Sequence, residues 1–176
     1  LRKGVRASYA SANRAYRNRA MFTYATGMNP KGWSFAVSGS RRWAEEGYVE
    51  GTSFDAYSYY LGAEKRINAN HSISLSAFGA AITQGRQALA VQEAYDLTDN
   101  PWYNPNWGYQ AGQKRNAKMS RDHKPMILLT HRMQVSPATR LTTSAYYTFG
   151  RDGLTGLNWF DAKDPRPDYY RYLPSY

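Results

Sequence analysis

Residues 33–43 read Trp-Ser-Phe-Ala-Val-Ser-Gly-Ser-Arg-Arg-Trp, and the alternation in this stretch decides the fold class. Large apolar side chains at Trp33, Phe35, Val37 and Trp43 fall on alternate positions, with Arg41 as the one interruption. The positions between them carry small or polar residues. Successive side chains of a β-strand point to opposite faces, so this period of two predicts a strand with one apolar and one polar face.

The same alternation recurs along most of the chain. In 55–67 and 71–84 apolar residues again alternate with serine, glycine and charged residues, and 140–151 repeats the pattern with threonine and tyrosine. Helical spacing is confined to residues 88–97, where a short helix is expected. The sequence therefore predicts an all-β, antiparallel protein with about seven strands, near residues 4–11, 15–28, 33–44, 55–67, 71–84, 124–135 and 140–151.

The links between these segments alternate in length. Residues 29–32, 68–70 and 136–139 are tight turns rich in Asn, Pro and Gly, whereas 45–54, 85–123 and 152–176 are long connections. Short turns on one side and long loops on the other are typical of outer-membrane β-barrels, whose long loops are extracellular. We therefore expect residues 1–176 to form part of a transmembrane β-barrel domain.

The composition agrees with a barrel wall better than with an ordinary globule. The mean hydropathy is −0.72, yet the chain holds 16 tyrosines and no cysteine. The longest apolar run, Met126–Leu129, is far shorter than the roughly 20 residues of a membrane-spanning helix. Polar strands with aromatic girdles suit a barrel. The net charge of +10 suits an anionic neighbour such as lipopolysaccharide, without identifying it.

The number of strands suggests that more strands are needed to close a barrel. Single-chain bacterial barrels have even strand numbers, and an open sheet edge cannot face lipid. The sequence also opens at Leu1 in polar, basic residues without the pattern of a signal peptide. We expect this chain to be one section of a larger barrel.

Several stretches resemble TonB-dependent outer-membrane receptors of the Bacteroidota type, SusC-like in the broad sense. They are 103–110 with 112–116, Asn18-Arg19 at the start of a strand, and 164–174. The resemblance implies a 22-stranded barrel with an N-terminal plug that imports a nutrient or other ligand across the outer membrane. It also implies the TonB energy-transducing complex as a partner, together with a SusD-like surface lipoprotein. No plug sequence is recognisable in these residues.

Strand parity and loop composition give three sets of candidate site residues. The predicted lumen-facing residues are Ser34, Ser38, Arg42, Ser58, Tyr60, Glu64, Ser74 and Ser76. The predicted membrane girdle is Trp33, Trp43, Tyr57, Tyr59, Tyr147 and Phe149. Aromatic and basic residues of the longest loop are the predicted ligand contacts, or else they pack that loop: Trp102, Tyr103, Trp107, Tyr109, Lys114 and Arg115.

Signals for enzymatic chemistry are weak. His71, His123 and His131 match no zinc motif, and 150–156 lacks the lysine of a phosphate loop. We therefore expect no enzymatic activity, catalytic residue, metal or cofactor. Membrane lipid and lipopolysaccharide are the expected surroundings, and nucleic acid is not an expected partner. Two alternatives remain open: a structural barrel docked to a surface lipoprotein, and a soluble basic β protein that binds polyanions or carbohydrate.

Overall fold

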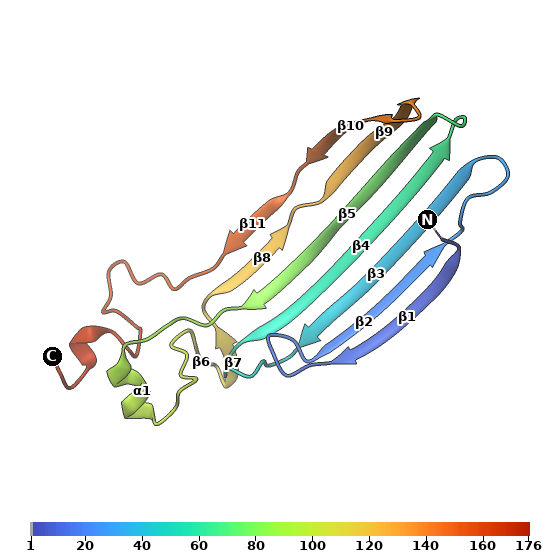
Figure 1. Ribbon diagram of the computed structural model, residues 1–176. Helices are drawn as coiled ribbons and strands as arrows, with labels where there is room; N and C mark the ends of the chain where they lie inside the picture. Colours follow the sequence, from blue (N-terminus) through green and yellow to red (C-terminus); the bar gives the residue numbers. More distant parts are fainter. Residues whose placement is uncertain (1) are drawn as a thin grey trace.

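The protein is built on one antiparallel sheet, seen in a computed structural model that describes residues 2–176 (Figure 1). Its first five strands pair in chain order: β1 (Gly4–Ser11), β2 (Asn18–Ala25), β3 (Trp33–Ala44), β4 (Ser53–Arg66) and β5 (His71–Gly85). The all-β, antiparallel expectation is confirmed.

The other edge of β5 pairs with two strands that lie end to end, β8 (Met119–His123) and β9 (Met126–Ser136). These pair in turn with β11 (Arg151–Leu154) and β10 (Thr139–Thr148). The register continues across the gap between β8 and β9, because Phe78 opposes Met126 and Ala81 opposes His123, an offset of three residues on both sides. It continues in the same way across the gap between β10 and β11, where Thr148 opposes Met126 and Arg151 opposes His123. The sheet is therefore seven strands wide, and its last two strands are each interrupted once.

The two interruptions lie side by side and have a backbone cause. Pro125 separates β8 from β9 and has no N–H to donate to a neighbouring strand. Gly150 separates β10 from β11 at a φ of +130°, and a Cβ there would lie 2.0 Å from the backbone oxygen of His123. Only glycine fits this close approach. Each of the two interruptions is therefore set by a residue of the sequence, Pro125 in one strand and Gly150 in the other.

Several predicted boundaries require correction. The segment 15–28 contains a strand only at β2, and 124–135 begins too late because β8 already pairs with β5 from Met119. The segment 140–151 is divided between β10 and β11, and β11 takes the first residues of the predicted loop 152–176. Residues 85–123 are not one irregular loop, since they hold α1 (Gln92–Thr98), the hairpin of β6 (Trp107–Gln110) with β7 (Gln113–Asn116), and β8.

Turn residues close the strands at one end of the sheet. Asn68 Oδ1 accepts hydrogen bonds from the backbone N–H groups of Asn70 at 2.8 Å and His71 at 2.9 Å. Asn29 Oδ1 accepts in the same way from Trp33 N–H at 2.9 Å. Asparagine side chains that bond to the following backbone fix tight turns. Figure 1 shows these turns at the end opposite α1, β6, β7 and the C-terminal segment, which holds the 3-10 turn η1 (Tyr170–Tyr172).

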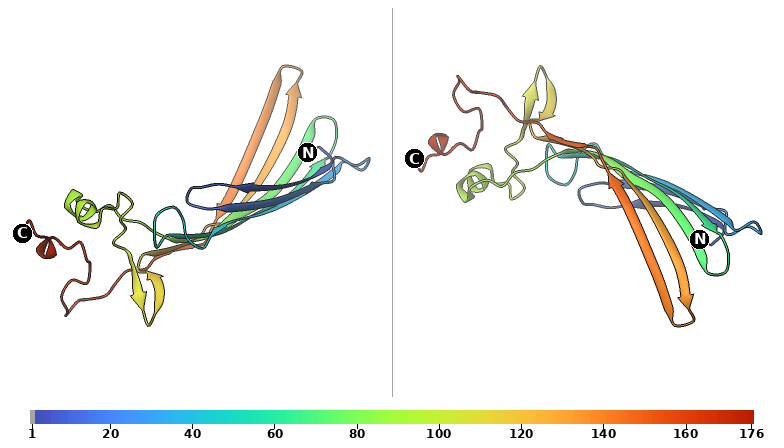
Figure 2. Two further views of the ribbon diagram at one scale, coloured as in Figure 1. Left: turned by 90° about the horizontal axis from the view of Figure 1, so that it is seen from below. Right: turned by 90° about the horizontal axis from the view of Figure 1, so that it is seen from above.

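The sheet is curved and twisted, and it is open in residues 2–176 (Figure 2). One edge strand is β1, and the opposite edge is formed by β10 and β11. The sequence predicts only a section of a larger barrel, and the sheet of the described residues does not close on itself. What the structure gives is a curved antiparallel wall with two unpaired edges.

The strands expose most of their large apolar side chains and bury small or polar ones, which is the reverse of the pattern in a soluble protein. The buried apolar residues of the described chain are four alanines and one valine: Ala25, Ala44, Ala56, Ala94 and Val49. In β3, β4 and β5 most large apolar side chains are exposed, whereas the small polar residues between them are half-buried or buried. Phe54, Phe78 and Ile82 are exceptions, since they are half-buried on the same face as the small polar residues. Side chains converge on the concave side of a curved sheet, so the crowded polar face is the concave one and the apolar face is convex.

The accessible surface gives the size of this effect. The chain exposes 12733 Å², whereas a compact monomer of 20.0 kDa exposes about 8,700 Å². The excess of about 4,000 Å² accords with a sheet whose two faces are not covered by another layer of the described chain. A sheet with such an apolar convex face needs a covering that residues 2–176 do not supply.

Candidate functional site

The eight predicted lumen residues share the concave face. Ser34 opposes Glu64, which opposes Ser74, and Ser38 opposes Tyr60. Directly opposed residues of antiparallel strands point to the same face. The remaining members follow by the same pairing: Arg42 opposite Ala56, Ser58 opposite Ser40, and Ser76 opposite Gly62.

Polar contacts on this face join neighbouring strands. Tyr60 Oη lies 3.3 Å from Ser76 Oγ, and Thr23 Oγ1 lies 2.7 Å from Ser38 Oγ. At the loop end, the guanidinium of Arg42 lies 5.7 Å from the ring centre of Tyr16 and 5.8 Å from that of Phe54. The concave face therefore carries hydrogen-bonded and charged groups, together with a few apolar residues such as Phe54, Phe78 and Leu128.

The six predicted girdle residues share the convex face. Trp33 stacks on Phe35 at the short-turn end, and Tyr147 stacks on Phe149, which lies in the gap after β10. Near the loop end, Tyr59 Oη lies 3.0 Å from His123 Nε2. The other members are Trp43, which lies on the row of Asp55, and Tyr57, which lies opposite Arg41.

The convex face has an apolar centre between two polar borders. One register row crosses all seven strands without a polar residue: Val5, Tyr24, Val37, Leu61, Ala77, Ile127 and Tyr147. The row of Trp33 holds Lys65 and His131 at the short-turn end, and the row of Trp43 holds Asp55 and Arg121 at the loop end. Ten residues separate these rows along β3, which is about 25 Å along the normal for a strand tilted near 40°.

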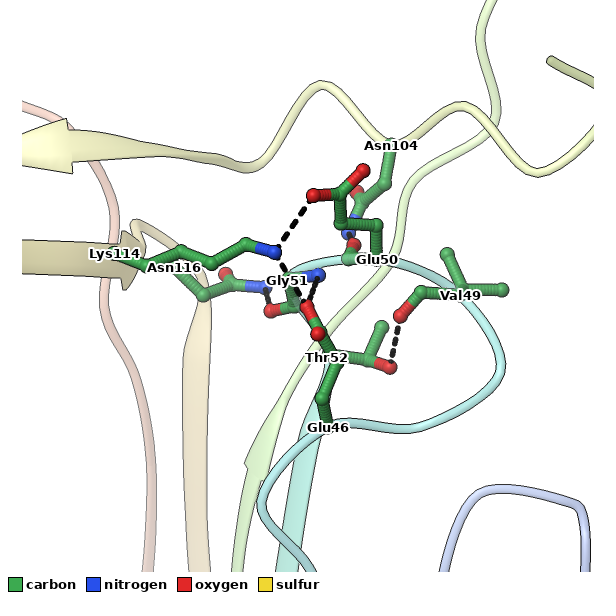
Figure 3. A network of polar contacts seen from close by, with 8 residues as sticks. All are labelled: Glu46, Val49, Glu50, Gly51, Thr52, Asn104, Lys114 and Asn116. Atoms are coloured by element: carbon green, nitrogen blue, oxygen red, sulfur yellow. Dashed lines mark hydrogen bonds and ion pairs between the residues drawn. The ribbon is translucent and has the colours of Figure 1, made fainter.

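Beyond the loop end, a charged cluster ties the longest loop to the β3–β4 loop (Figure 3). Lys114 Nζ donates to Glu46 Oε1 and to Glu50 Oε1, both at 2.7 Å, and lies 4.4 Å from the ring centre of Trp107. The same Glu46 oxygen accepts from Gly51 N–H at 2.7 Å. We call Glu46, Glu50 and Lys114 the loop clasp.

The charges of the clasp shift each other. The Lys114 ammonium, together with the Gly51 N–H, holds the pKa of Glu46 below its ordinary 4.5. In turn, hydrogen bonds to Glu46 and then to Glu50 raise the pKa of Lys114 above its ordinary 10.5. Both groups are therefore charged across the whole neutral range, and the clasp is intact there.

Asparagine side chains complete the attachment of the loop. Asn104 Nδ2 donates to the backbone oxygen of Glu50 at 3.1 Å, and Asn116 Nδ2 donates to that of Gly51 at 2.8 Å. Asn106 Nδ2 donates to the backbone oxygen of Arg86 at 3.0 Å. Asn104 and Asn106 are buried, so these amides act as internal anchors.

The six predicted ligand contacts divide into packing and exposed residues. Trp102 packs edge-on against Tyr48 at 5.1 Å, and Tyr103 packs edge-on against Tyr95 at 6.2 Å. Trp107 covers Gly51, where a Cβ would lie 2.2 Å from the indole. Together with Lys114 in the clasp, these residues hold the loop in shape.

Trp102 is 55% exposed despite its contact with Tyr48. Tyr109 and Arg115 are also exposed. They line a groove of about 500 Å³ with Trp107, Gln110 and Arg121, closed on the other side by Leu157, Pro165 and Pro167 of the C-terminal segment. We call this the loop groove. The C-terminal segment is held in place by Glu93 of α1, whose Oε1 accepts from Ser175 N–H at 2.9 Å. The groove therefore joins segments that lie far apart in the chain.

The anchoring residues Glu46, Glu50 and the asparagines are absent from the predicted site. Their types gave a weak signal, because Asn in a loop reads as a turn former rather than as a long-range donor. The expected helix is also placed differently. It begins after Val91, so Leu89 lies outside it and is 88% exposed.

Chemically, the described residues offer binding surfaces. No group of three or more His, Asp or Glu side chains within residues 2–176 is arranged to hold a metal ion. None of the helices described here is long and apolar enough to cross a membrane. No family model, curated protein or solved structure matches this chain.

Proposed function

We propose that this chain is a section of the wall of an outer-membrane β-barrel that takes up a ligand, of the TonB-dependent receptor type. The observation that carries this proposal is the polarity of the sheet. A convex face with an unbroken apolar row, bordered by charged and aromatic rows about 25 Å apart, fits the lipid-facing side of a barrel. The polar concave face fits a water-filled lumen.

The unpaired edges support closure by further strands. Within residues 2–176, β1 and the β10–β11 pair each present one edge without a partner. Unpaired backbone groups are costly in lipid, so barrels close the sheet completely. In this proposal, strands outside residues 2–176 pair with both edges and complete the lumen.

The loops support a receptor rather than a plain pore. The clasp and the asparagine anchors shape the longest loop before any ligand arrives, and a preformed site loses less entropy on binding. Tyr109, Arg115 and Gln110 then present aromatic, cationic and amide groups at the loop groove. The TonB complex and a SusD-like lipoprotein remain proposals that rest on the resemblance alone.

The first test is the fractionation of cells that make the protein, combined with the intact mass of the purified species. The proposal expects a species several times 20 kDa, confined to the outer membrane and dependent on detergent. A 20 kDa protein that stays in solution without detergent would contradict it and would favour a soluble basic β protein. A Tyr109→Ala/Arg115→Ala double variant then tests the loop groove, with loss of uptake expected while the protein still inserts.

A further inference from the structure

The loop end of the convex face contains a hollow whose residues face outward. Two adjacent register rows define it: Tyr57, Ala81, His123 and Arg151 in one, and Asp55, Thr83, Arg121 and Gly153 in the other. These residues line a space of about 450 Å³. The small side chains of Ala81 and Thr83, and the lack of one at Gly153, leave that space open. We call it the rim hollow.

Two arginines flank the rim hollow without an acidic partner. Arg151 lies opposite His123 and Arg121 lies opposite Gly153, so the two are diagonal neighbours on one face. Such neighbours lie about 7–8 Å apart, within reach of one ligand for long side chains. Neither forms an ion pair with any residue in the described part of the chain.

The acidic groups nearby are neutralised or face away. Asp55 accepts from Arg41 at 2.9 and 3.1 Å, so its charge is matched on the same face. Asp152 pairs with Lys124 at 2.9 Å. Asp152 and Asp122 oppose each other on the concave face, although both border the hollow. On the convex face, Arg41, Arg121 and Arg151 therefore outweigh the single carboxylate of Asp55.

The lower border of the hollow is apolar. Tyr59 crosses β5 above Gly79 to reach His123, and a Cβ on Gly79 would lie 2.7 Å from the tyrosine Oη. Phe149 and Tyr147 follow on the neighbouring strand, both about half-exposed or more. A molecule seated here meets cations at one end and an aromatic, apolar surface at the other, which is the polarity of a lipid.

We propose that the rim hollow binds the phosphate group of an outer-leaflet glycolipid, with its acyl chains along the apolar face below. This inference rests on the proposed function, because it requires the convex face to meet lipid and the long loops to face outward. Arginine is suited to phosphate because its planar fork donates two parallel hydrogen bonds. The guanidinium groups of Arg121 and Arg151, on neighbouring strands, can together hold one phosphate group or two adjacent ones.

The test is native mass spectrometry of the full-length protein in detergent, with added lipopolysaccharide and with the same lipid after enzymatic removal of its phosphates. We expect the phosphorylated lipid to bind at least about tenfold more tightly. The Arg121→Ala/Arg151→Ala variant loses that preference. The matched control, Arg66→Ala/Arg132→Ala, removes two arginines from the concave face and keeps it. Size-exclusion and thermal unfolding in detergent establish that both variants are folded.

Each outcome decides the inference. The inference is overturned if the wild type binds both lipids equally. It is also overturned if the folded Arg121→Ala/Arg151→Ala variant keeps its full preference for the phosphorylated lipid. Inorganic phosphate at millimolar concentration is the third probe, and displacement of the lipid by inorganic phosphate at equal affinity would assign the hollow to free phosphate instead. A protein that needs no detergent would refute the proposed function itself, a result distinct from any of these.

Discussion

Gly150 is the residue on which the joint between β10 and β11 depends. Its φ of +130° lies in a region that only glycine adopts readily, and a Cβ would meet the His123 carbonyl oxygen. We predict that Gly150→Ala lowers the free energy of unfolding by about 1–3 kcal/mol. Urea titration of the protein in lipid vesicles measures this. Gly153→Ala is the control, since nothing lies within 4 Å of a Cβ there, and an equal loss in both variants would contradict the argument.

The loop clasp gives a prediction about pH. Glu46 has a lowered pKa, so its contribution is present above its ordinary 4.5 and is lost as pH falls through the lowered value. Lys114 has a raised pKa, so its contribution is present below 10.5 and is lost as pH rises through the raised value. A nitroxide on Gln113→Cys should therefore report a rigid loop between these two limits. It should report a mobile loop when the pH falls below the lower limit or rises above the upper one. The chain has no other cysteine to interfere.

Glu46→Gln isolates the ion pair in the same spin-labelled protein. The amide oxygen still accepts from Gly51 N–H, but the charge opposite Lys114 is gone. Because the pair is partly exposed, we expect only a two- to fivefold gain in loop opening at neutral pH, corresponding to less than about 1 kcal/mol. Glu45→Gln removes a neighbouring charge outside the clasp and should change nothing. A flat pH response in the wild type would show that the clasp does not hold the loop.

Among the elements, β3 carries the strongest sequence signal and also the sharpest test of which face meets lipid. Val37 and Ser38 are adjacent but point to the convex and concave faces. We predict that in vesicles a water-soluble maleimide labels Ser38→Cys and leaves Val37→Cys unlabelled, because a thiol in the apolar band does not ionise. Labelling of both variants after unfolding in urea is the control. Equal reaction of both positions with the water-soluble reagent would contradict a lipid-facing convex side.

Strands that cross the apolar zone between the rows of Trp33 and Trp43 were predictable from the sequence. Strands that lie outside this zone were not. The predicted strands 4–11 and 33–44 have the bounds of β1 and β3. Large apolar residues alternate along most of β3, whereas β1 carries only Val5 and Tyr9 on its apolar face. In β8, Arg121 and His123 alternate with Ser120 and Asp122, so both faces are polar at the loop end and no period of two stands out. The β6–β7 hairpin is missed because each of its strands has only four residues, too few for a period of two to stand out.

The loop site was predictable by residue type and not by contact. Aromatic and basic residues drew attention to 102–115, and the loop groove does contain Trp107, Tyr109 and Arg115. Which of them packs and which faces solvent depends on partners more than fifty residues away, such as Glu46 for Lys114 and Glu50 for Asn104. Long-range pairs of this kind leave no periodic trace in a single sequence.

At the scale of the whole molecule, the inverted polarity of the sheet governs which substitutions it tolerates. Leu61 lies in the apolar row and is 54% exposed, so in water a charged residue there would be almost without cost. In lipid the same position lies near the middle of the apolar band. We predict that Leu61→Arg destabilises the protein in vesicles by about 2–4 kcal/mol, the cost of a midplane arginine on a barrel.

Ser58→Arg is the matched control for Leu61→Arg, since it lies three residues away on the same strand and faces the concave side. A water-filled lumen accommodates an arginine, so this variant should unfold at nearly the wild-type urea concentration in vesicles. The contrast between the two variants separates membrane insertion from ordinary packing, because in a soluble sheet the buried side is the one that rejects charge. If Ser58→Arg were the more damaging variant, the polar face would be the covered one and the convex apolar face would not meet lipid.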